Sequence, residues 1–374
     1  MGLGRHREST PELLTTLCAI LRGDAEPPLG EEGQRLFDLA RGHRVDHLVA
    51  CRGGAGPASL DRPRLETLLL EDVCVRELTR VLAALEEVGA QPLVFKGAAL
   101  AHTHYPESWL RPRLDSDVLI AEDRRPQVFD VLGSLGYQRP AFVSGDLVMY
   151  QTMFVREDPA VIEHVLDLHW RVANCQTIAC TLTHAELVAR GSTVSALGYP
   201  MRVPSAVDAL VLACLHRAAH HGDAEDLLWL YDIHLVAGRL SPSEWGHVTS
   251  LASDRGVRAI CARGLQLAQE RFETVVPAGV VEQLTPDTRS PREPSAVYLR
   301  KDLRPVDRLW VALRALGPWA GAHLVWEHVC PPADYMARTY GVRHRMLLPL
   351  YYARRAFRGA SKWLGRARRR DRIR

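Results

Sequence analysis

The chain has 374 residues, of which 47% are hydrophobic and 24% are charged, and its net charge is +3. This length allows two or three domains with a sizeable core, and the composition excludes a largely disordered chain. The charge is unevenly distributed, because residues 341–374 carry twelve Lys or Arg and one Asp, a net charge of +11, which leaves −8 for the rest. A mildly acidic body with a strongly basic end indicates a C-terminal segment that meets an anionic partner.

The beginning of the chain and the cysteines bear on its location. The first residues, MGLGRHRESTPELL, lack the apolar core of a secretion signal, and no run of about 18 apolar residues predicts a membrane span. The closest cysteines, Cys175 and Cys180, are spaced more widely than the cysteine pairs of zinc sites. We therefore expect reduced thiols and a cytoplasmic protein.

Residues 1–90 are predicted to form an N-terminal helical region. Apolar residues recur on one face with the period of an α-helix: Leu65, Leu69, Val73, Leu78, Leu82 and Leu85. Gly89 is a natural end for this helix.

Residues 91–175 are predicted to form a small α/β core. Short strands are expected at residues 93–95, 118–120 and 148–155, with a helix opening after Lys96-Gly97 and another ending at Gly136. The strongest strand is VIEHVLDLHWRV, residues 161–172, which alternates between two faces. Its two faces are Glu163, Val165, Asp167 and His169 on one side, and Ile162, His164, Leu166, Leu168 and Trp170, expected in the core, on the other.

Asp115-Ser116-Asp117 stands directly before the second strand. Two carboxylates two residues apart on an extended chain point to the same side, and Mg²⁺ prefers oxygen ligands. The third carboxylate would come from the strongest strand, as Asp167 or, failing that, Glu163. Asp-x-Asp alone is also typical of a solvated turn, and it is the order of strand, Lys-Gly, helix, arginines and second strand that favours a metal site.

Phosphate groups would need cations and close backbone approach in front of these acids. Lys96 is predicted to neutralise triphosphate charge, and Gly97 to let the backbone approach a phosphate. Arg111 or Arg113 would bind phosphate oxygens, for which the guanidinium fork is suited.

Residues 176–284 are predicted to form a second helical region. One helix starts at Pro204-Ser205, another follows Gly222, and a third starts at Ser241. The residues of this region that bear on its chemistry are its histidines.

His216 and His220 are four residues apart and share a helical face. Together with Asp232 they line an acceptor pocket in one interpretation. In the other they form a buried polar cluster in which Asp232 accepts a hydrogen bond from one of the two histidines; a dedicated zinc site is a third alternative. His169, two residues after Asp167, would contact substrate or donate to a metal-bound carboxylate.

Residues 285–374 are predicted to form a proline-rich linker, a helix and a basic tail. Phe357 and Leu364 are seven residues apart and lie among arginines. This pattern is typical of a helix lying on an anionic membrane, of an arm that binds nucleic acid or an acidic peptide, and of a solvated terminus.

The stretch PLVFKGAALA…YP…LRPRLDSDVLI, followed by VLDLHW and LACLHRAAHH…LLWLYDIHLV, resembles the uncharacterised nucleotidyltransferases of the DNA polymerase beta superfold. The resemblance implies an α+β fold with a small mixed sheet inside a largely helical chain. It also implies two-metal transfer of a nucleoside monophosphate from an NTP such as ATP, with Asp115, Asp117 and Asp167 as catalytic residues that bind Mg²⁺ or Mn²⁺. The wider superfold usually carries Gly-Ser where this chain has Lys96-Gly97.

The acceptor of the transfer is left open between a small molecule and a peptide or protein. The alternative function is a catalytically weak or inactive nucleotide-binding adaptor. Its basic tail would dock on membrane, nucleic acid or peptide, which would place the protein at the membrane periphery.

Overall fold

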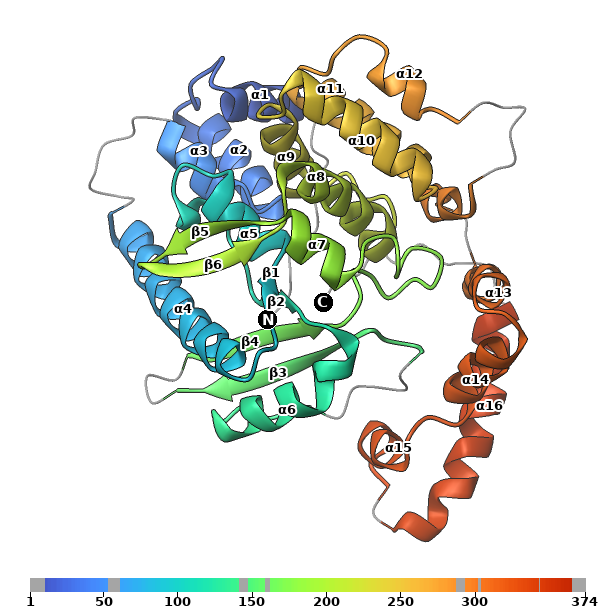
Figure 1. Cartoon of the computed structure of the whole chain (residues 1–374). Coiled ribbons are helices and arrows are strands. Elements are labelled where there is room, and N and C mark those ends of the chain that lie inside the picture. The colour runs from blue at the N-terminus through green and yellow to red at the C-terminus, as the bar shows by residue number, and fades with distance from the viewer. Residues whose placement is uncertain are drawn as a thin grey trace.

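The computed structural model describes residues 11–52, 61–140, 147–158, 162–286, 293–301, 304–342 and 344–364. At its centre lies a mixed sheet of four strands in the order β1-β2-β4-β3, with helices around it (Figure 1). The strands are β1 Leu93–Val94, β2 Ser116–Leu119, β3 Gln151–Glu157 and β4 Glu163–His169. Only β2 and β4 run parallel, whereas β1 and β3 are antiparallel to their neighbours. The predicted α+β class with a small mixed sheet is confirmed.

Strand β4 forms because its side chains alternate between core and site. Leu166 and Leu168 are buried in the core beneath the sheet, whereas Asp167 is half-buried on the other face. Trp170 is also buried, as predicted, and packs with Tyr150. The alternation places every other residue of β4 on the face where β2 carries its acid.

Four helices precede the sheet: α1 Pro11–Arg22, α2 Gly30–Gly42, α3 Asp46–Arg52 and α4 Asp61–Glu87. The second half of α4 covers the sheet core with Leu78, Leu82 and Leu85. Leu65 and Leu69 of the same predicted apolar face are 55% and 57% exposed, because the first half of the helix extends beyond the sheet. The expected face is therefore buried over only part of its length.

Two helices lie within the sheet region. Helix α5, Lys96–Thr103, follows β1 directly, and helix α6, Arg125–Ser134, follows β2. Short 3₁₀ turns, η1 at Ser108–Leu110 and η2 at Glu122–Arg124, precede β2 and α6. Gly136 ends the α6 segment with a φ of +88°, a conformation that glycine adopts without steric cost. Both helices were predicted from the sequence.

The second half of the body contains helices and one hairpin. The helices are α7 His184–Arg190, α8 Ala206–Leu215, α9 Leu227–Ala237, α10 Pro242–Asp254, α11 Arg258–Phe272 and α12 Val280–Leu284. The three predicted helix starts are confirmed, since Ser205 caps α8, α9 follows Gly222, and Ser241 forms a capping box with Glu244 at α10.

A β-hairpin interrupts the predicted helical region at residues 176–284. Strands β5, Ser192–Ala196, and β6, Tyr199–Val203, pair antiparallel and lie against β1 and α5. Both turn residues, Leu197 and Gly198, have positive φ, as in type I′ turns. The usual sequence signal of that turn is Asn-Gly, and Leu in its place explains why the hairpin is missed.

The C-terminal helices form an arm that projects from the body at the lower right of Figure 1. We use this name for α13 Pro305–Ala315, α14 Pro318–Val329, α15 Ala333–Tyr340, η5 Arg345–Leu347 and α16 Leu348–Leu364, which follow the 3₁₀ turn η4 Pro294–Leu299. Glu327 of α14 accepts hydrogen bonds from the backbone N–H groups of Leu147 and Val148, 2.8 and 3.0 Å away, and so attaches the arm to the body.

Only part of the predicted basic tail can be described, namely the backbone up to residue 364 and the side chains up to residue 356. The side chains of residues 357–364 and the whole of residues 365–374 lie outside the described residues, and these include Phe357 and Leu364. Across the described ranges, every helix is too short or too polar to cross a membrane.

Candidate active site

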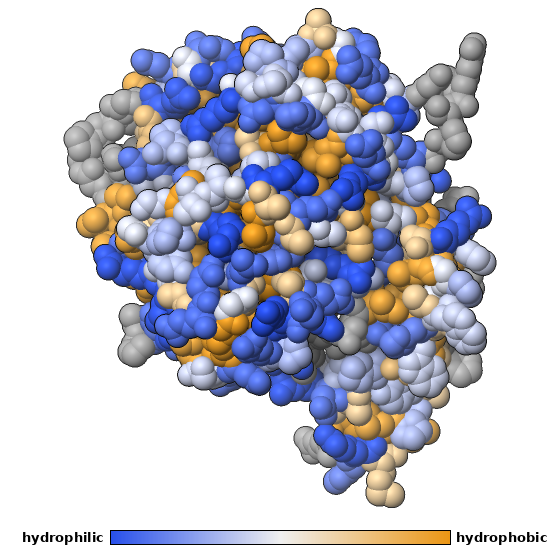
Figure 2. Space-filling model, viewed as in Figure 1, coloured by the Kyte–Doolittle hydropathy of each residue, from blue (hydrophilic) through white to orange (hydrophobic). Residues whose placement is uncertain are grey.

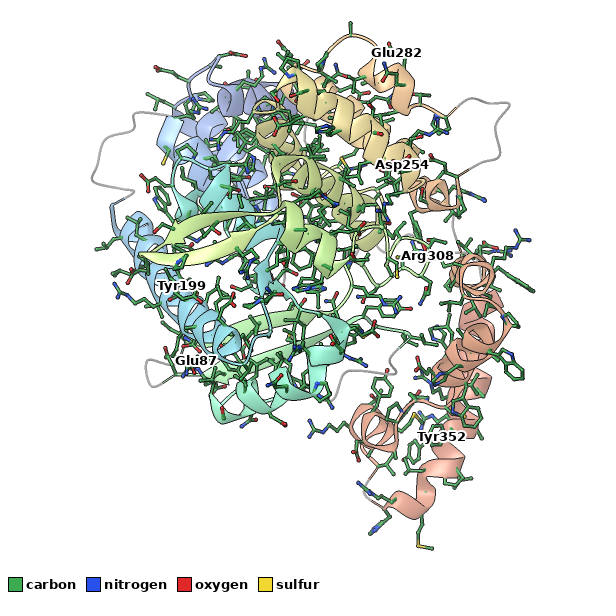
Figure 3. The ribbon with its side chains drawn as sticks, viewed as in Figure 1. Glu87, Tyr199, Asp254, Glu282, Arg308 and Tyr352 are labelled. Carbon is green, nitrogen blue, oxygen red and sulfur yellow. The ribbon has the colours of Figure 1, made fainter. Side chains whose placement is uncertain are left out.

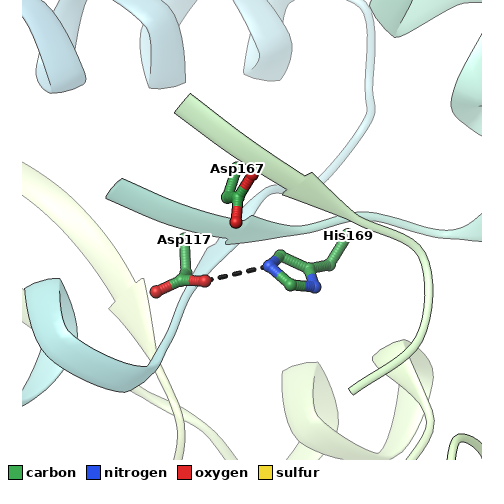
Figure 4. A group of neighbouring side chains, drawn as sticks. All are labelled: Asp117, Asp167 and His169. Atoms are coloured by element: carbon green, nitrogen blue, oxygen red, sulfur yellow. Dashed lines mark hydrogen bonds and ion pairs between the residues drawn. The ribbon is translucent and has the colours of Figure 1, made fainter. Parts of the chain in front are cut away.

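Two carboxylates lie side by side on the parallel strands β2 and β4. Asp117 and Asp167 are direct register partners, so both side chains leave the same face of the sheet (Figure 4). Asp117 is buried and Asp167 is half-buried. Ligand atoms of Asp117, Asp167 and His169 all lie within 4.8 Å of one another, close enough to share one cation. We call these three residues the acid cluster.

Lys96 supplies the positive charge beside the acid cluster. Its ammonium lies 2.7 Å from Asp117 Oδ1 and 3.3 Å from His169 Nε2, and its backbone has a φ of +50° at the start of α5. Burial alone would raise the pKa of Asp117, but Lys96 and the hydrogen bond from His169 hold that pKa well below its usual range. Lys96 therefore neutralises Asp117 directly and does not extend into solvent.

His169 is completely buried beside Asp117. Its Nε2 lies 2.9 Å from Asp117 Oδ1, and its ring stands edge-on to Phe95. Burial and then the charge of Lys96 lower the pKa of His169 to about 4, so the ring is neutral near pH 7. In this state the Nε2–H tautomer donates to Asp117 and fixes the carboxylate.

Asp167 is hydrogen-bonded to an amide, whereas Asp117 forms an ion pair. Burial, then repulsion from Asp117 and Asp115, raises its pKa to about 7. Gln151 donates a hydrogen bond to Asp167 Oδ2 at 2.8 Å, and Asn174 donates to Gln151 at 2.9 Å, which fixes the orientation of the carboxylate. Sequence reasoning missed Gln151 and Asn174, because the only signal was a polar residue inside the strand predicted at residues 148–155.

Asp115 lies one residue before β2, at a bend. Burial, and then repulsion from Asp117, raise the pKa of Asp115. Asp115 does not belong to the acid cluster. It lines a neighbouring hollow of about 390 Å³ together with Glu77, Arg113 and Glu163. Its predicted role as a metal ligand, and the fallback role of Glu163, remain predictions.

The two arginines predicted to bind phosphate have other partners in this structure. Arg111 donates to Asp232 through Nε and Nη2, 2.8 and 2.6 Å away, and both side chains are about 5% exposed. Tyr105 donates its hydroxyl to the same carboxylate. Arg113 pairs with Glu71 at 3.1 Å. Contact of either arginine with a triphosphate thus stays a prediction.

Gly97 has a second role beside the one predicted. A Cβ at this position would collide with the Arg111 guanidinium, so the glycine makes room for the buried arginine. Its φ is negative, which means that close approach and not backbone conformation requires the glycine here.

The histidines lie on a π-helical turn, η3 His216–His220, that continues α8. Such turns are frequent at functional sites. His221 stacks on Trp229 with ring centroids 3.7 Å apart, and its Nε2 lies 3.2 Å from His216 Nε2. Burial and the charge of Lys96 lower the pKa of His220 to about 3, and the pKa of His216 also lies well below its usual value. These rings are neutral near pH 7.

The predicted hydrogen bond from His216 or His220 to Asp232 is wrong. Asp232 is occupied by Arg111 and Tyr105, and His220 Nε2 has no hydrogen-bond partner among the described residues. The rings of His216, His220 and His221 instead contact one another, and His221 stacks on Trp229. A buried imidazole without a partner is available to a ligand.

A pocket opens between α5, α8 and α9 next to the acid cluster. It encloses about 470 Å³, part of it open to solvent, and its polar lining residues are Lys96, Thr103, Arg111, His216, Trp229 and Asp232. Small apolar side chains complete its wall, among them Ala99, Leu212 and Ala213. The pocket has the mixed apolar and polar character of small-molecule sites.

Comparison with known proteins agrees with this geometry. A family model described as "Uncharacterised nucleotidyltransferase" matches residues 30–273, more than half of the chain. No curated protein matches the sequence. The matched range contains the sheet, the acid cluster and the pocket, and it excludes the arm.

Proposed function

The chain belongs to the uncharacterised nucleotidyltransferase family, and from that premise we propose that it transfers a nucleoside monophosphate from an NTP to an acceptor at the acid cluster. The observation that carries the proposal is the register pairing of Asp117 with Asp167, which puts two carboxylates on one face beside a buried lysine. Phosphoryl chemistry relies on such charge placement, since positioning and electrostatic stabilisation do most of the catalytic work.

We propose that a divalent cation, Mg²⁺ or Mn²⁺, binds at the acid cluster. The donor set fits, because the carboxylates of Asp117 and Asp167 suit either ion, while His169 donates to Asp117 and orients it. The raised pKa of Asp167 supports the same conclusion, because Lys96 does not fully compensate the negative charges of Asp117 and Asp115 around this carboxyl. A bound divalent ion would neutralise phosphate charge and orient the attacking oxygen in line with the leaving group.

The residues of the chain then have distinct tasks in this proposal. Asp117 and Asp167 hold the ion, with Gln151 fixing the second carboxylate and His169 the first. Lys96 exchanges its bond to Asp117 for a phosphate oxygen once another cation compensates the carboxylate. The acceptor oxygen bonds to the α-phosphorus as the bond to the bridging oxygen breaks and pyrophosphate leaves.

We place the acceptor in the pocket between α5, α8 and α9. Trp229 and the neutral His216 offer an aromatic surface there, and Lys96 forms the border with the acid cluster. Neutral histidines can donate to or accept from an acceptor hydroxyl without repelling a cationic neighbour. The uncommitted Nε2 of His220 supplies one further polar contact in this region.

Calorimetric titration of Mg²⁺ or Mn²⁺ with each NTP tests the proposal. We expect metal-dependent NTP binding by the wild type and its loss in Asp117→Asn and Asp167→Asn. Asp130→Asn is the matched control, because Asp130 is exposed on α6 away from the cluster. Equal binding by all four proteins would refute the site.

Release of pyrophosphate separates transfer from the adaptor alternative. Metal-dependent NTP binding that never releases pyrophosphate, in the presence of a broad set of hydroxyl-bearing acceptors, would favour a nucleotide-binding adaptor. Release that depends on both Asp117 and Asp167 would support the transferase.

A further inference from the structure

Three exposed tryptophans distinguish the arm from the body. Trp310 on α13 is 61% exposed, and Trp319 and Trp326 on α14 are 88% and 62% exposed. The tryptophans of the body are all buried: Trp109, Trp170, Trp229 and Trp245. Among the described residues, exposed indole rings therefore occur only in the arm.

The exposure on α14 belongs to one face of the helix. Trp319 and Trp326 are seven residues apart and so lie on the same face, with the half-exposed His323 between them. Leu324, on the other side of the helix, is buried, and Glu327, which pairs with His323, binds the backbone of the body. The indole face has no packing partner among the described residues, although the helix itself is well anchored.

A second exposed apolar group lies at the start of α16. Met346 is 92% exposed and Leu350 is 68% exposed, with Leu347 between them at 40%. Arg345 and Arg354 are exposed in the same stretch. Exposed aliphatic side chains and arginines thus occur together over residues 345–354 of the arm.

The arm also begins the most cationic part of the chain. Residues 341–374 carry a net charge of +11, against −8 for the remainder. Figure 2 shows apolar and polar residues interspersed over the arm, and Figure 3 places Arg308 near the body and Tyr352 further along it. The arm carries exposed indoles, aliphatic residues and strong positive charge, and this combination calls for a partner with both an anionic and an apolar layer.

We propose that the arm binds the surface of an anionic lipid bilayer. Tryptophan rings settle at the boundary between headgroups and acyl chains, where their apolar body and polar N–H are both satisfied. Arginines near such a surface are attracted by anionic headgroups. This inference does not depend on the proposed nucleotidyl transfer, because the arm lies outside the residues that carry it.

Nucleic acid and acidic peptides fit the same surface less well. Arginines alone would serve phosphate groups, and exposed Trp side chains could stack on unpaired bases. Met346, Leu347 and Leu350, however, have nothing to contact on a phosphate backbone, whereas they gain from leaving water for the acyl boundary.

Flotation of the full-length protein with vesicles tests the inference. We expect binding to phosphatidylcholine vesicles that contain phosphatidylglycerol to be at least about tenfold tighter than binding to phosphatidylcholine alone, and to weaken with salt. Indole fluorescence should shift to shorter wavelength on binding, since the exposed rings leave water.

Matched variants separate the arm from general stickiness. Trp319→Ser/Trp326→Ser should lose most of the binding without a change in thermal unfolding, because both side chains are exposed. Leu29→Ser/Val275→Ser removes two side chains of the body that are 92% and 82% exposed and should bind as the wild type does. Arg345→Gln/Arg354→Gln should weaken binding by about fivefold for each arginine removed.

Four outcomes would overturn the inference. Equal binding to neutral and anionic vesicles would remove the role of charge, and full binding by the Trp double variant would remove the role of the indole face. Binding to single-stranded RNA without binding to vesicles would assign the arm to nucleic acid. Concentration-dependent dimers that disappear in the Trp double variant, again without vesicle binding, would assign the face to a second copy of the chain.

Discussion

Replacing Asp232 by Ala tests whether Arg111 serves the fold or the substrate. The two side chains share two charge-assisted hydrogen bonds of 2.8 and 2.6 Å, both are about 5% exposed, and Tyr105 donates to the same carboxylate. The pair joins the segment before β2 to helix α9, 121 residues further along the chain. Removing Asp232 would leave a guanidinium buried without a counter-charge.

The expected cost is large for a single substitution. Breaking a buried ion pair by removing one partner destabilises a protein by about 3–5 kcal/mol, mostly through the uncompensated charge. The hydroxyl of Tyr105 loses its acceptor as well, which adds about 1 kcal/mol. We therefore expect Asp232→Ala to lower the free energy of unfolding by about 4–6 kcal/mol.

Urea unfolding followed by circular dichroism measures this loss. Glu86→Ala is the control, because it breaks an equally short but partly exposed ion pair with Arg202 and should cost less than about 1 kcal/mol. Arg111→Met/Asp232→Leu should recover most of the stability, since it removes both charges and fills the space. A cost for Asp232→Ala no greater than that for Glu86→Ala would refute the reasoning and leave Arg111 available to phosphate.

Three further predictions follow from the same contacts. Asp167 has a pKa of about 7 in the folded protein and about 4 in the unfolded chain, so between these values the folded protein binds one more proton. The free energy of unfolding should therefore fall as the pH rises from about 4 to 7. Unfolding measured in metal-free buffer at pH 5 and pH 7.5 should show a smaller fall for Asp167→Asn than for the wild type. Gly97→Ala should lower the unfolding free energy by about 1–3 kcal/mol, because the new methyl group meets a guanidinium that cannot move aside, whereas Gly133→Ala on exposed α6 should be neutral or stabilising. Ser241→Ala should cost about 1 kcal/mol in the same unfolding assay, since it removes the capping box with Glu244, and an unchanged midpoint would contradict the cap.

The arrangement of the acids could be predicted because it rests on local patterns. Alternation along β4 placed Asp167 and His169 on one face, and the apolar residues after Asp117 marked the neighbouring strand. The register that makes Asp117 and Asp167 direct partners is a property of the parallel pairing and is not written in either segment. Asp115 lies one residue before β2, so it has no register partner on β4 and lies outside the acid cluster.

The partners of long side chains could not be predicted. Arg111 pairs with Asp232 across 121 residues of sequence, and Lys96 pairs with Asp117 across 21 residues. Burial decides these pairings, since a charge that leaves water needs the nearest opposite charge. Burial in turn depends on how α8 and α9 pack on the sheet, which no local pattern reveals.

Glu327 connects the arm to the segment that leads into β3. Glu327 holds the backbone of Leu147 and Val148, and four residues after Leu147 the same segment reaches Gln151, whose amide fixes Asp167. One backbone segment and two kinds of hydrogen bond therefore connect α14 of the arm to the carboxylate of Asp167.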